Sequence, residues 1–259
     1  MKWDPAKYAE FGNYRDRPYF DLTGRVLKDD ARHVVDLGCG PGNLTATLAD
    51  RWPGADVVGI DASEAMLHKA AELAAARPNL SFTLADIAHW MPSGRTDVVV
   101  TNAALQWVPG HRDLLARWLA ALRPGAWFAL QVPGNFNAPS HALMRQVAES
   151  AQWLEALDGV LRHEDAVGEA VEYLRIMLDA GCQAEAWETT YCQVMQGPDP
   201  VLEWVRGTGL RPVLAALGAE EGAAFEEEYS ARLREAYPPT PHGTVFPFRR
   251  IFAVARKFG

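Results

Sequence analysis

The sequence predicts an α/β fold in which a mostly parallel β-sheet carries helices on both faces. Short apolar runs alternate with helical patterns between residues 33 and 132, an arrangement typical of such a sheet. A glycine-rich turn at 38–42 joins the first apolar run to the first helix. Hydrophobic residues make up 49% of the 259 residues, enough for one substantial core. We therefore expect a single domain over residues 1–259.

The first half of the chain supplies five strands and three helices. The apolar runs predict strands at 33–36, 56–60, 80–85, 97–101 and 126–132. Helical spacing predicts helices at 43–51, 64–76 and 112–122. The apolar face of the first helix holds Leu44, Leu48 and Trp52. Ser63 is the expected N-cap of the second helix, and Arg123-Pro124-Gly125 ends the third.

The second half adds one helix and two strands to this pattern. A helix at 167–180 stops at Gly181, and strands follow at 183–194 and 247–256. The expected buried face of the helix holds Val167, Val171, Leu174 and Leu178. Side chains alternate between two faces along the last strand, so Arg249 and Arg250 point in opposite directions.

Three segments remain outside this pattern, at 1–30, 134–165 and 197–245. The core of the domain is then expected at 31–133, 166–196 and 246–259. Ligands of open α/β sheets bind beyond the carboxyl ends of the strands, and long connections at that edge become lids. We therefore expect the three segments to cover the ligand and to shape its pocket.

Composition and charge exclude several classes of protein. The net charge of −8 and the lack of any lysine or arginine run disfavour nucleic-acid binding, because phosphates need clustered cations. No apolar run approaches the roughly 18 residues of a membrane span, and the N-terminus lacks the apolar region of a secretory signal. The three cysteines and seven histidines show no metal-ligand spacing. We expect a cytoplasmic protein with no metal, no membrane contact and no obligate protein partner.

The glycine-rich turn predicts the chemistry of the ligand. From Asp36 to Gly42 the order is Asp-x-Gly-x-Gly-x-Gly, and its glycines let a ligand approach bare amides at a helix N-terminus. A dinucleotide fingerprint would need glycine where Asn43 stands. Asp36 would repel a pyrophosphate and attract an amine, while Asp61 can accept hydrogen bonds from ribose hydroxyls. The expected ligand is a nucleoside that carries an amino group.

These features resemble those of the class I methyltransferases that use S-adenosylmethionine and have a Rossmann-like fold. Further segments spread over nearly the whole chain resemble the trans-aconitate 2-methyltransferase family. They are residues 3–5 with Tyr8 and Phe11, 15–18, 102–107, 187–191, 208–212 and 246–250. The resemblance implies a seven-stranded sheet whose last strand lies antiparallel beside the fifth. It also implies carboxyl O-methyltransferase activity that converts S-adenosylmethionine and trans-aconitate into a monomethyl ester and S-adenosylhomocysteine.

The same resemblance implies a cofactor site beyond the carboxyl ends of the strands. Asp86 would bind the adenine amino group with Ile87 against the ring, although a capping acid and a core isoleucine would give the same pattern. The loop at 102–107 would run beneath the sulfonium. The implied cofactor-binding residues are Asp36, Gly38, Cys39, Gly40, Asn43, Asp61, Ala62, Met66, Asp86, Ile87, Asn102, Ala103 and Trp107.

Arginines are the candidates for binding an acceptor with three carboxylates. The candidates are Arg17, Arg145, Arg211 and Arg250, each with a surface ion pair as its alternative role. Pro212 biases the backbone of Arg211 toward extended geometry at the start of a helix. Arg250 shares a strand face with Phe248 and Phe252.

No general base is expected, because a carboxylate acceptor is already ionised at neutral pH. Positioning would then carry the catalysis. The residues expected to position the reactants are Arg250, Arg211, Trp107 and Tyr8.

Three other functions fit parts of the sequence. A methyltransferase for another small or carrier-bound carboxylate fits the core equally well, although no basic docking face for an acidic carrier is visible. A nicotinamide-dependent oxidoreductase is disfavoured by Asp36 and Asn43. A protein that binds S-adenosylmethionine without catalysis is the alternative outside enzymology.

Overall fold

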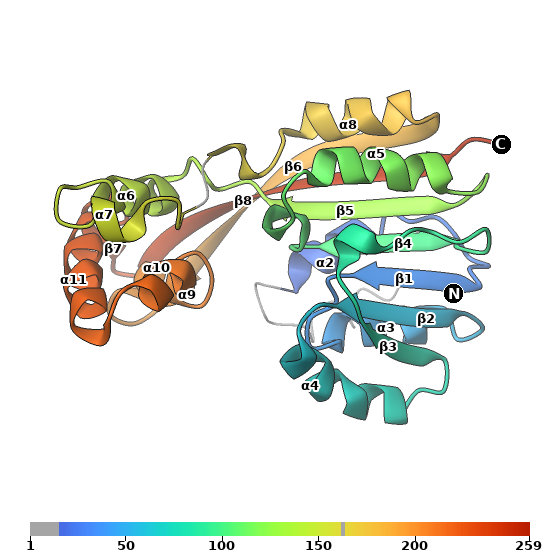
Figure 1. Ribbon diagram of the computed structural model, residues 1–259, viewed down its shortest axis with the longest axis horizontal. Helices are drawn as coiled ribbons and strands as arrows, with labels where there is room; N and C mark the ends of the chain where they lie inside the picture. Colours follow the sequence, from blue (N-terminus) through green and yellow to red (C-terminus); the bar gives the residue numbers. More distant parts are fainter. Residues whose placement is uncertain (1–15, 162–163) are drawn as a thin grey trace. The chain divides into compact units, whose positions relative to one another are not determined.

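A computed structural model describes residues 16–161 and 164–259 (Figure 1). The described residues form two compact units. The first lies within Met1–Val132, Val167–Glu188 and Ile251–Gly259. The second consists of Pro133–Ala166 and Thr189–Arg250. Three strands run from one unit into the other, because the unit boundaries fall inside them.

The sheet has the order β3-β2-β1-β4-β5-β8-β6, read from the bottom of the view upward (Figure 1). Its strands are β1 (His33–Leu37), β2 (Asp56–Asp61), β3 (Leu80–Leu84), β4 (Val98–Asn102), β5 (Trp127–Pro133), β6 (Cys182–Met195) and β8 (Gly243–Lys257). Strands β1 to β5 are parallel to one another. The backbone of β8 pairs with β5 from Lys257 beside Gly125 to Arg249 beside Gly134, so it runs antiparallel. The predicted fold class is confirmed, and the last long strand lies antiparallel beside the fifth, as expected.

An eighth strand, β7 (Pro239–Thr240), pairs antiparallel with β8 and was not predicted. A two-residue strand is too short to show an alternating pattern.

Helices cover both faces of the sheet in the first unit. They are α2 (Arg17–Thr23), α3 (Asn43–Arg51), α4 (Glu64–Ala75), α5 (His111–Ala121) and α8 (Ala170–Asp179), with short 3₁₀ turns η1 (Ile87–His89) and η2 (Leu105–Trp107). Trp118 of α5 stacks on Phe128 of β5, whereas Thr45 of α3 donates a hydrogen bond to Asp36 of β1. The strand register places Phe128 and Asp36 on opposite faces. The predicted cap of α4 is confirmed, since the Ser63 side chain accepts from the Met66 amide at 3.4 Å.

The predicted buried face of α8 is wrong. Val171 and Leu178 are 49% and 51% exposed, while Tyr173 and Met177 are fully buried. The buried face of α8 is rotated toward Tyr173 because the hydroxyl of this residue has hydrogen-bond partners in the core. It lies 2.8 Å from Nε2 of His111 and 3.1 Å from the Gly168 amide. A buried tyrosine with a satisfied hydroxyl contributes more apolar area than valine.

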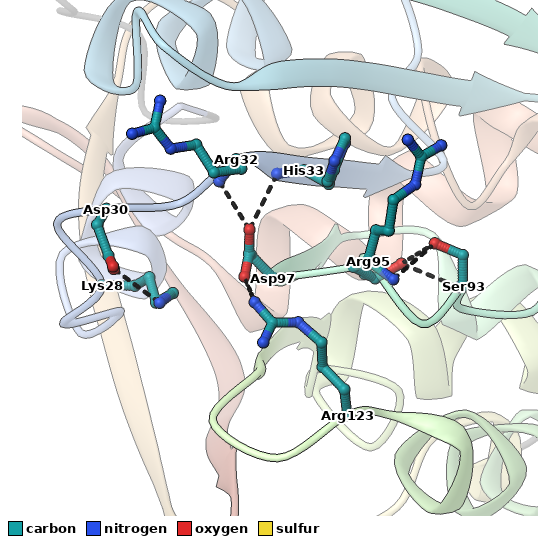
Figure 2. A network of polar contacts seen from close by, with 9 residues as sticks. Lys28, Asp30, Arg32, His33, Ser93, Arg95, Asp97 and Arg123 are labelled. Atoms are coloured by element: carbon teal, nitrogen blue, oxygen red, sulfur yellow. Dashed lines mark hydrogen bonds and ion pairs between the residues drawn. The ribbon is translucent and has the colours of Figure 1, made fainter.

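A buried acid anchors the amino ends of the central strands, at the edge opposite to the expected ligand site (Figure 2). Asp97 precedes β4 and its Oδ2 accepts from the backbone amides of Arg32 at 2.7 Å and His33 at 3.1 Å. Its Oδ1 accepts a charged hydrogen bond from Arg123, which follows α5. The carboxylate therefore joins three chain segments that are far apart in sequence.

The second unit is mainly helical. It contains α6 (Pro139–Ala148), α7 (Leu154–Leu157), η3 (Glu164–Ala166), α9 (Pro200–Arg206), α10 (Arg211–Ala216) and α11 (Ala219–Ala236). Tyr229 of α11 donates its hydroxyl hydrogen to the Ser140 carbonyl, and the Ser140 amide donates to Tyr237 at 3.0 Å. The rings of Phe246 and Phe248, on β8, pack against Trp204. This unit has its own aromatic core.

The unit boundaries differ from the predicted division into core and lids. Described residues of the segment 1–30 belong to the first unit, where Tyr19 and Leu22 are buried. Residues 189–195 of β6 and 246–250 of β8, expected in the core, belong to the second unit. Strand periodicity alone cannot show where a long strand leaves one core and enters another.

Candidate functional site

The glycine-rich turn after β1 adopts a backbone that its glycines make possible. Gly38, Gly40 and Gly42 have φ of 76°, 56° and 78°. A Cβ on Gly38 would lie 2.3 Å from the Ala104 Cβ, and one on Gly42 would lie 2.5 Å from the Phe82 ring. A Cβ on Gly40 would meet no atom of residues 16–161 or 164–259 within 4 Å. The outer glycines therefore permit close packing, and Gly40 leaves open space beside the backbone.

Asp61, the last residue of β2, reaches across to this turn. Its Oδ2 accepts from the Gly40 amide at 2.9 Å, and its Oδ1 accepts from the Ser63 amide at 2.8 Å. The half-buried carboxylate thus lies where the turn after β1 meets the turn after β2. The hydroxyl groups of a ribose bound here could donate hydrogen bonds to the same two carboxylate oxygens of Asp61.

Asp36 brings a second carboxyl group to the turn and is 3% exposed. Thr45 donates to its Oδ2 at 2.7 Å. Burial raises the pKa of Asp36 to about 6, opposed by hydrogen bonds from Thr45 and Tyr19, and the charge of Asp61 raises it further. Ionisation of Asp36 is therefore costly until a positive group lies nearby.

The loop after β4 lies against the glycine-rich turn, through the close approach of Ala104 to Gly38. Ala103 has a φ of 54°, rare for a residue with a side chain, and its amide donates to the Gln131 carbonyl at 2.9 Å. Gln106 donates from Nε2 to the Ala103 carbonyl at 2.5 Å. The loop is thus held by β5 and by its own side chain.

The remaining predicted cofactor residues lie around these turns. Asp86 is exposed and caps η1, its Oδ1 accepting from the Ala88 amide at 2.9 Å, while Ile87 is buried. Burial raises the pKa of the Cys39 thiol well above its ordinary value, and Asp36 and Asp61 raise it further. Met66 is half-buried. Like Asp86, three further predicted residues are exposed, namely Asn43, Ala62 and Trp107.

The structure therefore brings together the turn residues from β1, β2 and β4. Asp86 and Ile87 follow β3, the next strand in the sheet. Tyr8, expected to cover the site, lies outside the described residues, as do Trp3 and Arg15.

Three of the four predicted acceptor arginines lie in the second unit. Arg145 donates from Nη1 to the Phe136 carbonyl at 2.8 Å. Arg250 is 7% exposed and its guanidinium lies 4.3 Å from the centre of the Phe248 ring. Arg249 instead donates to the Gly134 carbonyl at 3.2 Å, as strand alternation predicts.

The predicted extended geometry of Arg211 is wrong. Helix α10 begins at this residue, which is exposed. Proline in the first turn of a helix removes no internal hydrogen bond, so the helix tolerates Pro212 directly after its first residue. Arg17, the fourth candidate, is exposed in the first unit, 3.7 Å from Asp21.

Two cavities lie among the described residues of the second unit. One of about 20 Å³ is lined by Phe136, His141, Met144, Arg145, Leu161, Gly209 and Pro212. It brings Arg145 beside the segment that contains Arg211. The other, of about 350 Å³, lies among residues 197–202, the end of α11 and β7, and holds none of the predicted site residues.

Two residues near the turn were not predicted. Thr45, the partner of Asp36, has no distinguishing signal in the sequence. Gln131 does have one, since it is the only polar residue in the run Trp127-Phe128-Ala129-Leu130-Gln131-Val132. A single polar residue in a buried central strand is expected to form a hydrogen bond to another group.

Residues 16–161 and 164–259 contain neither a metal-binding cluster nor a membrane-spanning helix. No group of three or more His, Cys, Asp or Glu side chains is placed to hold a metal ion. None of the described helices combines the length and the apolar character of a membrane span.

Comparison with known proteins also indicates a methyltransferase. A family model described as a methyltransferase domain matches residues 34–125. A trans-aconitate 2-methyltransferase of Streptomyces avermitilis is 53% identical over 98% of this chain and 97% of its own length. One of Rhodococcus jostii is 51% identical over 98% and 99%. The crystal structure of the YcgJ protein of Bacillus subtilis shares the fold, with a TM-score of 0.62 at 14% identity over 93% of this chain and 99% of that one. The chain belongs to the trans-aconitate 2-methyltransferase family.

Proposed function

We propose that this protein transfers a methyl group from S-adenosylmethionine to a carboxylate of trans-aconitate. The products are a monomethyl ester and S-adenosylhomocysteine. The observation that carries the proposal is the identity of 53% and 51% to two trans-aconitate 2-methyltransferases over 98% of the chain, a span that takes in the acceptor-side segments as well as the glycine-rich turn.

The geometry of the first unit fits S-adenosylmethionine. The open side of Gly40 leaves room for a ligand against the backbone, and Asp61 would accept from the ribose hydroxyls. Asp36 would stabilise the ammonium group, which in turn would relieve the cost of ionising a buried acid. Asp86 and Ile87 would bind the adenine, with the loop at 102–107 near the sulfonium. The other predicted contacts are Gly38, Cys39, Asn43, Ala62, Met66 and Trp107.

When bound, the cofactor supplies a methyl group that its sulfonium already activates. The protein need only align a carboxylate oxygen of the acceptor with the methyl carbon, so that the C–O bond forms as the C–S bond breaks and its electron pair stays on sulfur. No proton moves, because the carboxylate is ionised. Alignment of this kind can lower a barrier by up to about 7–11 kcal/mol.

Arginines would hold the carboxylates that do not react. A guanidinium can bind a carboxylate through two parallel hydrogen bonds, which fixes its orientation. We assign this role to Arg211, Arg250 and Arg145 of the second unit and to Arg17 of the first. The acceptor then presents its remaining carboxylate to the methyl group.

Mass spectrometry of the protein with isotopically labelled S-adenosylmethionine and a panel of di- and tricarboxylates tests the proposal. We expect one labelled methyl group on trans-aconitate, with other acids labelled more slowly. Equilibrium binding of S-adenosylmethionine without label transfer to any acid would contradict it. Faster labelling of a different acid would correct the acceptor.

A further inference from the structure

Gln131 of β5 has a buried carboxamide that makes no hydrogen bond to any residue the structure describes. The residue is 0% exposed, and among the described residues neither Nε2 nor Oε1 has a hydrogen-bond partner. On the neighbouring strand β4, Oδ1 of Asn102 is likewise buried and has no hydrogen-bond partner within the described segments. A buried amide without hydrogen bonds is costly, so such a group in a native protein calls for an explanation.

The register brings these two amides together. Asn102, the last residue of β4, pairs directly with Gln131, so both side chains leave the same face of the sheet. Asp36 leaves that face too, because it pairs with Val100, two residues before Asn102. The Gln131 backbone also holds Ala103 in its left-handed conformation. The amide therefore belongs to the same edge and face as the proposed cofactor site.

The strand order indicates which ligand Gln131 meets. The cofactor groups are assigned in sequence along the sheet, from adenine after β3 to ribose after β2, and then to the turns after β1 and β4. Strand β5 is the next neighbour, about 4.8 Å beyond β4. The ligand that lies beyond the methyl-bearing end of the cofactor is the acceptor. The acceptor is therefore the ligand that we expect Gln131 to contact.

We propose that Gln131 binds the carboxylate that receives the methyl group, with Nε2 donating to the oxygen that does not attack. This inference rests on the proposed function and names a residue that fixes the reacting end of the acceptor. A neutral hydrogen-bond donor suits a position close to the sulfonium. A cation would be repelled by the sulfonium, and its stronger hydrogen bond would hold more charge on the carboxylate that must attack.

Three variants separate this role from a structural one. Gln131→Met keeps the shape and removes both polar atoms, whereas Gln131→Glu keeps the polarity and adds a negative charge. Thr101→Val is the matched control, since Thr101 is 0% exposed and its Oγ1 has no hydrogen-bond partner among the described residues, yet it leaves the opposite face beside Leu130. Calorimetry gives the dissociation constant of S-adenosylmethionine, and steady-state kinetics give kcat and KM for trans-aconitate.

We expect Gln131→Met to lower kcat/KM for trans-aconitate ten- to a hundredfold while cofactor affinity stays within twofold. Gln131→Glu should lower kcat/KM further, because the glutamate and the acceptor carboxylate are both negative. Thr101→Val should change neither kcat/KM nor cofactor affinity more than twofold. Should Gln131→Met fail to fold, the comparison of Gln131→Glu with wild type decides. Unimpaired kcat/KM in the Gln131 variants, or equal losses of cofactor and acceptor binding, would overturn the inference alone. A wild-type protein that binds the cofactor but methylates no carboxylate would overturn the proposed function and this inference with it.

Discussion

Asp36 shows how a single buried side chain can link stability, pH and ligand binding. Its carboxyl group has a pKa of about 6 in the folded protein, against about 4 in an unfolded chain. The folded protein therefore binds this proton more tightly than the unfolded chain does. The stability that comes from Asp36 is complete below pH 4, falls as the pH rises to 6, and stays low above it.

Replacing Asp36 by Asn should remove this dependence. The difference in free energy of unfolding between wild type and Asp36→Asn should shift by about 2–3 kcal/mol between pH 4 and pH 7, in favour of the variant at pH 7. Urea unfolding without cofactor at the two pH values measures it. A difference that does not vary with pH would mean that Asp36 ionises freely in the folded state.

Asp61 offers a more direct test of the cofactor site. Asp61→Ala removes a charged acceptor from the ribose hydroxyls at a cost of about 1.5–3 kcal/mol, so the affinity for S-adenosylmethionine should fall roughly ten- to a hundredfold. Calorimetry measures the affinity. Asp50→Ala is the control, because Asp50 is half exposed and pairs with Arg77. Unchanged affinity in Asp61→Ala would remove Asp61 from the site.

At the scale of secondary structure elements, Asp97 joins the amino ends of β1 and β4 to the end of α5. Burial acts to raise the pKa of Asp97, but the amides of Arg32 and His33 and the guanidinium of Arg123 outweigh it and hold the pKa below its ordinary value. Asp97→Asn should lower the free energy of unfolding by about 1–3 kcal/mol at neutral pH. This loss of stability should shrink as the pH falls through the lowered pKa of Asp97, because the wild-type carboxyl group is then neutral, as the asparagine amide is.

Chemical unfolding of Asp97→Asn checks this expectation. Asp30→Asn is the control, since Asp30 is 80% exposed in its pair with Lys28 and an exposed pair contributes little. Cofactor affinity should be unchanged in both variants, because Asp97 precedes β4 and so lies at the opposite edge of the sheet from the proposed site.

The arginines of β8 and α10 carry the prediction for acceptor binding. Arg250→Met and Arg211→Met should each lower kcat/KM for trans-aconitate by an amount equivalent to about 2–5 kcal/mol, since each leaves a carboxylate unpaired. Cofactor affinity should change little. Arg249→Met is the control, because Arg249 points to Gly134 on the other face of the strand. Loss of activity in Arg249→Met with retention in Arg250→Met would reverse the assignment of the two faces.

The elements that could be predicted are those with a strong local signal. The five parallel strands were placed within about one residue because buried strands are continuous apolar runs. The face of α8 was not predictable, because two apolar stripes compete on one helix. Nor was the partnership of Asp36 with Thr45, since it depends on how α3 packs on β1.

On the scale of the whole molecule, the proposed cofactor site falls in one unit and most of the acceptor arginines fall in the other. Hydrogen exchange should reveal this division. S-adenosylhomocysteine alone should slow exchange in the turns after β1, β2, β3 and β4, because ligand binding lowers the population of opened states. Further addition of trans-aconitate should slow exchange in α6, α10 and the second-unit part of β8.

Mass spectrometry after timed exchange resolves these segments. Protection of the second unit by the cofactor product alone would contradict the division of binding between units. The turn between α5 and β5, which lies at the Asp97 edge, serves as an internal reference and should not respond to either ligand.

The route of the chain through the two units also limits how the protein can be recombined. The second unit is built from two separate stretches, so the chain passes between units four times, and three of those passages lie inside β5, β6 and β8, which are neighbours in one sheet. A single protease cut cannot release either unit as a separate polypeptide. Exchange of acceptor specificity with a related enzyme would need both stretches to be transplanted together, with their junctions in register, and variation within the family is therefore expected to proceed by substitution in place.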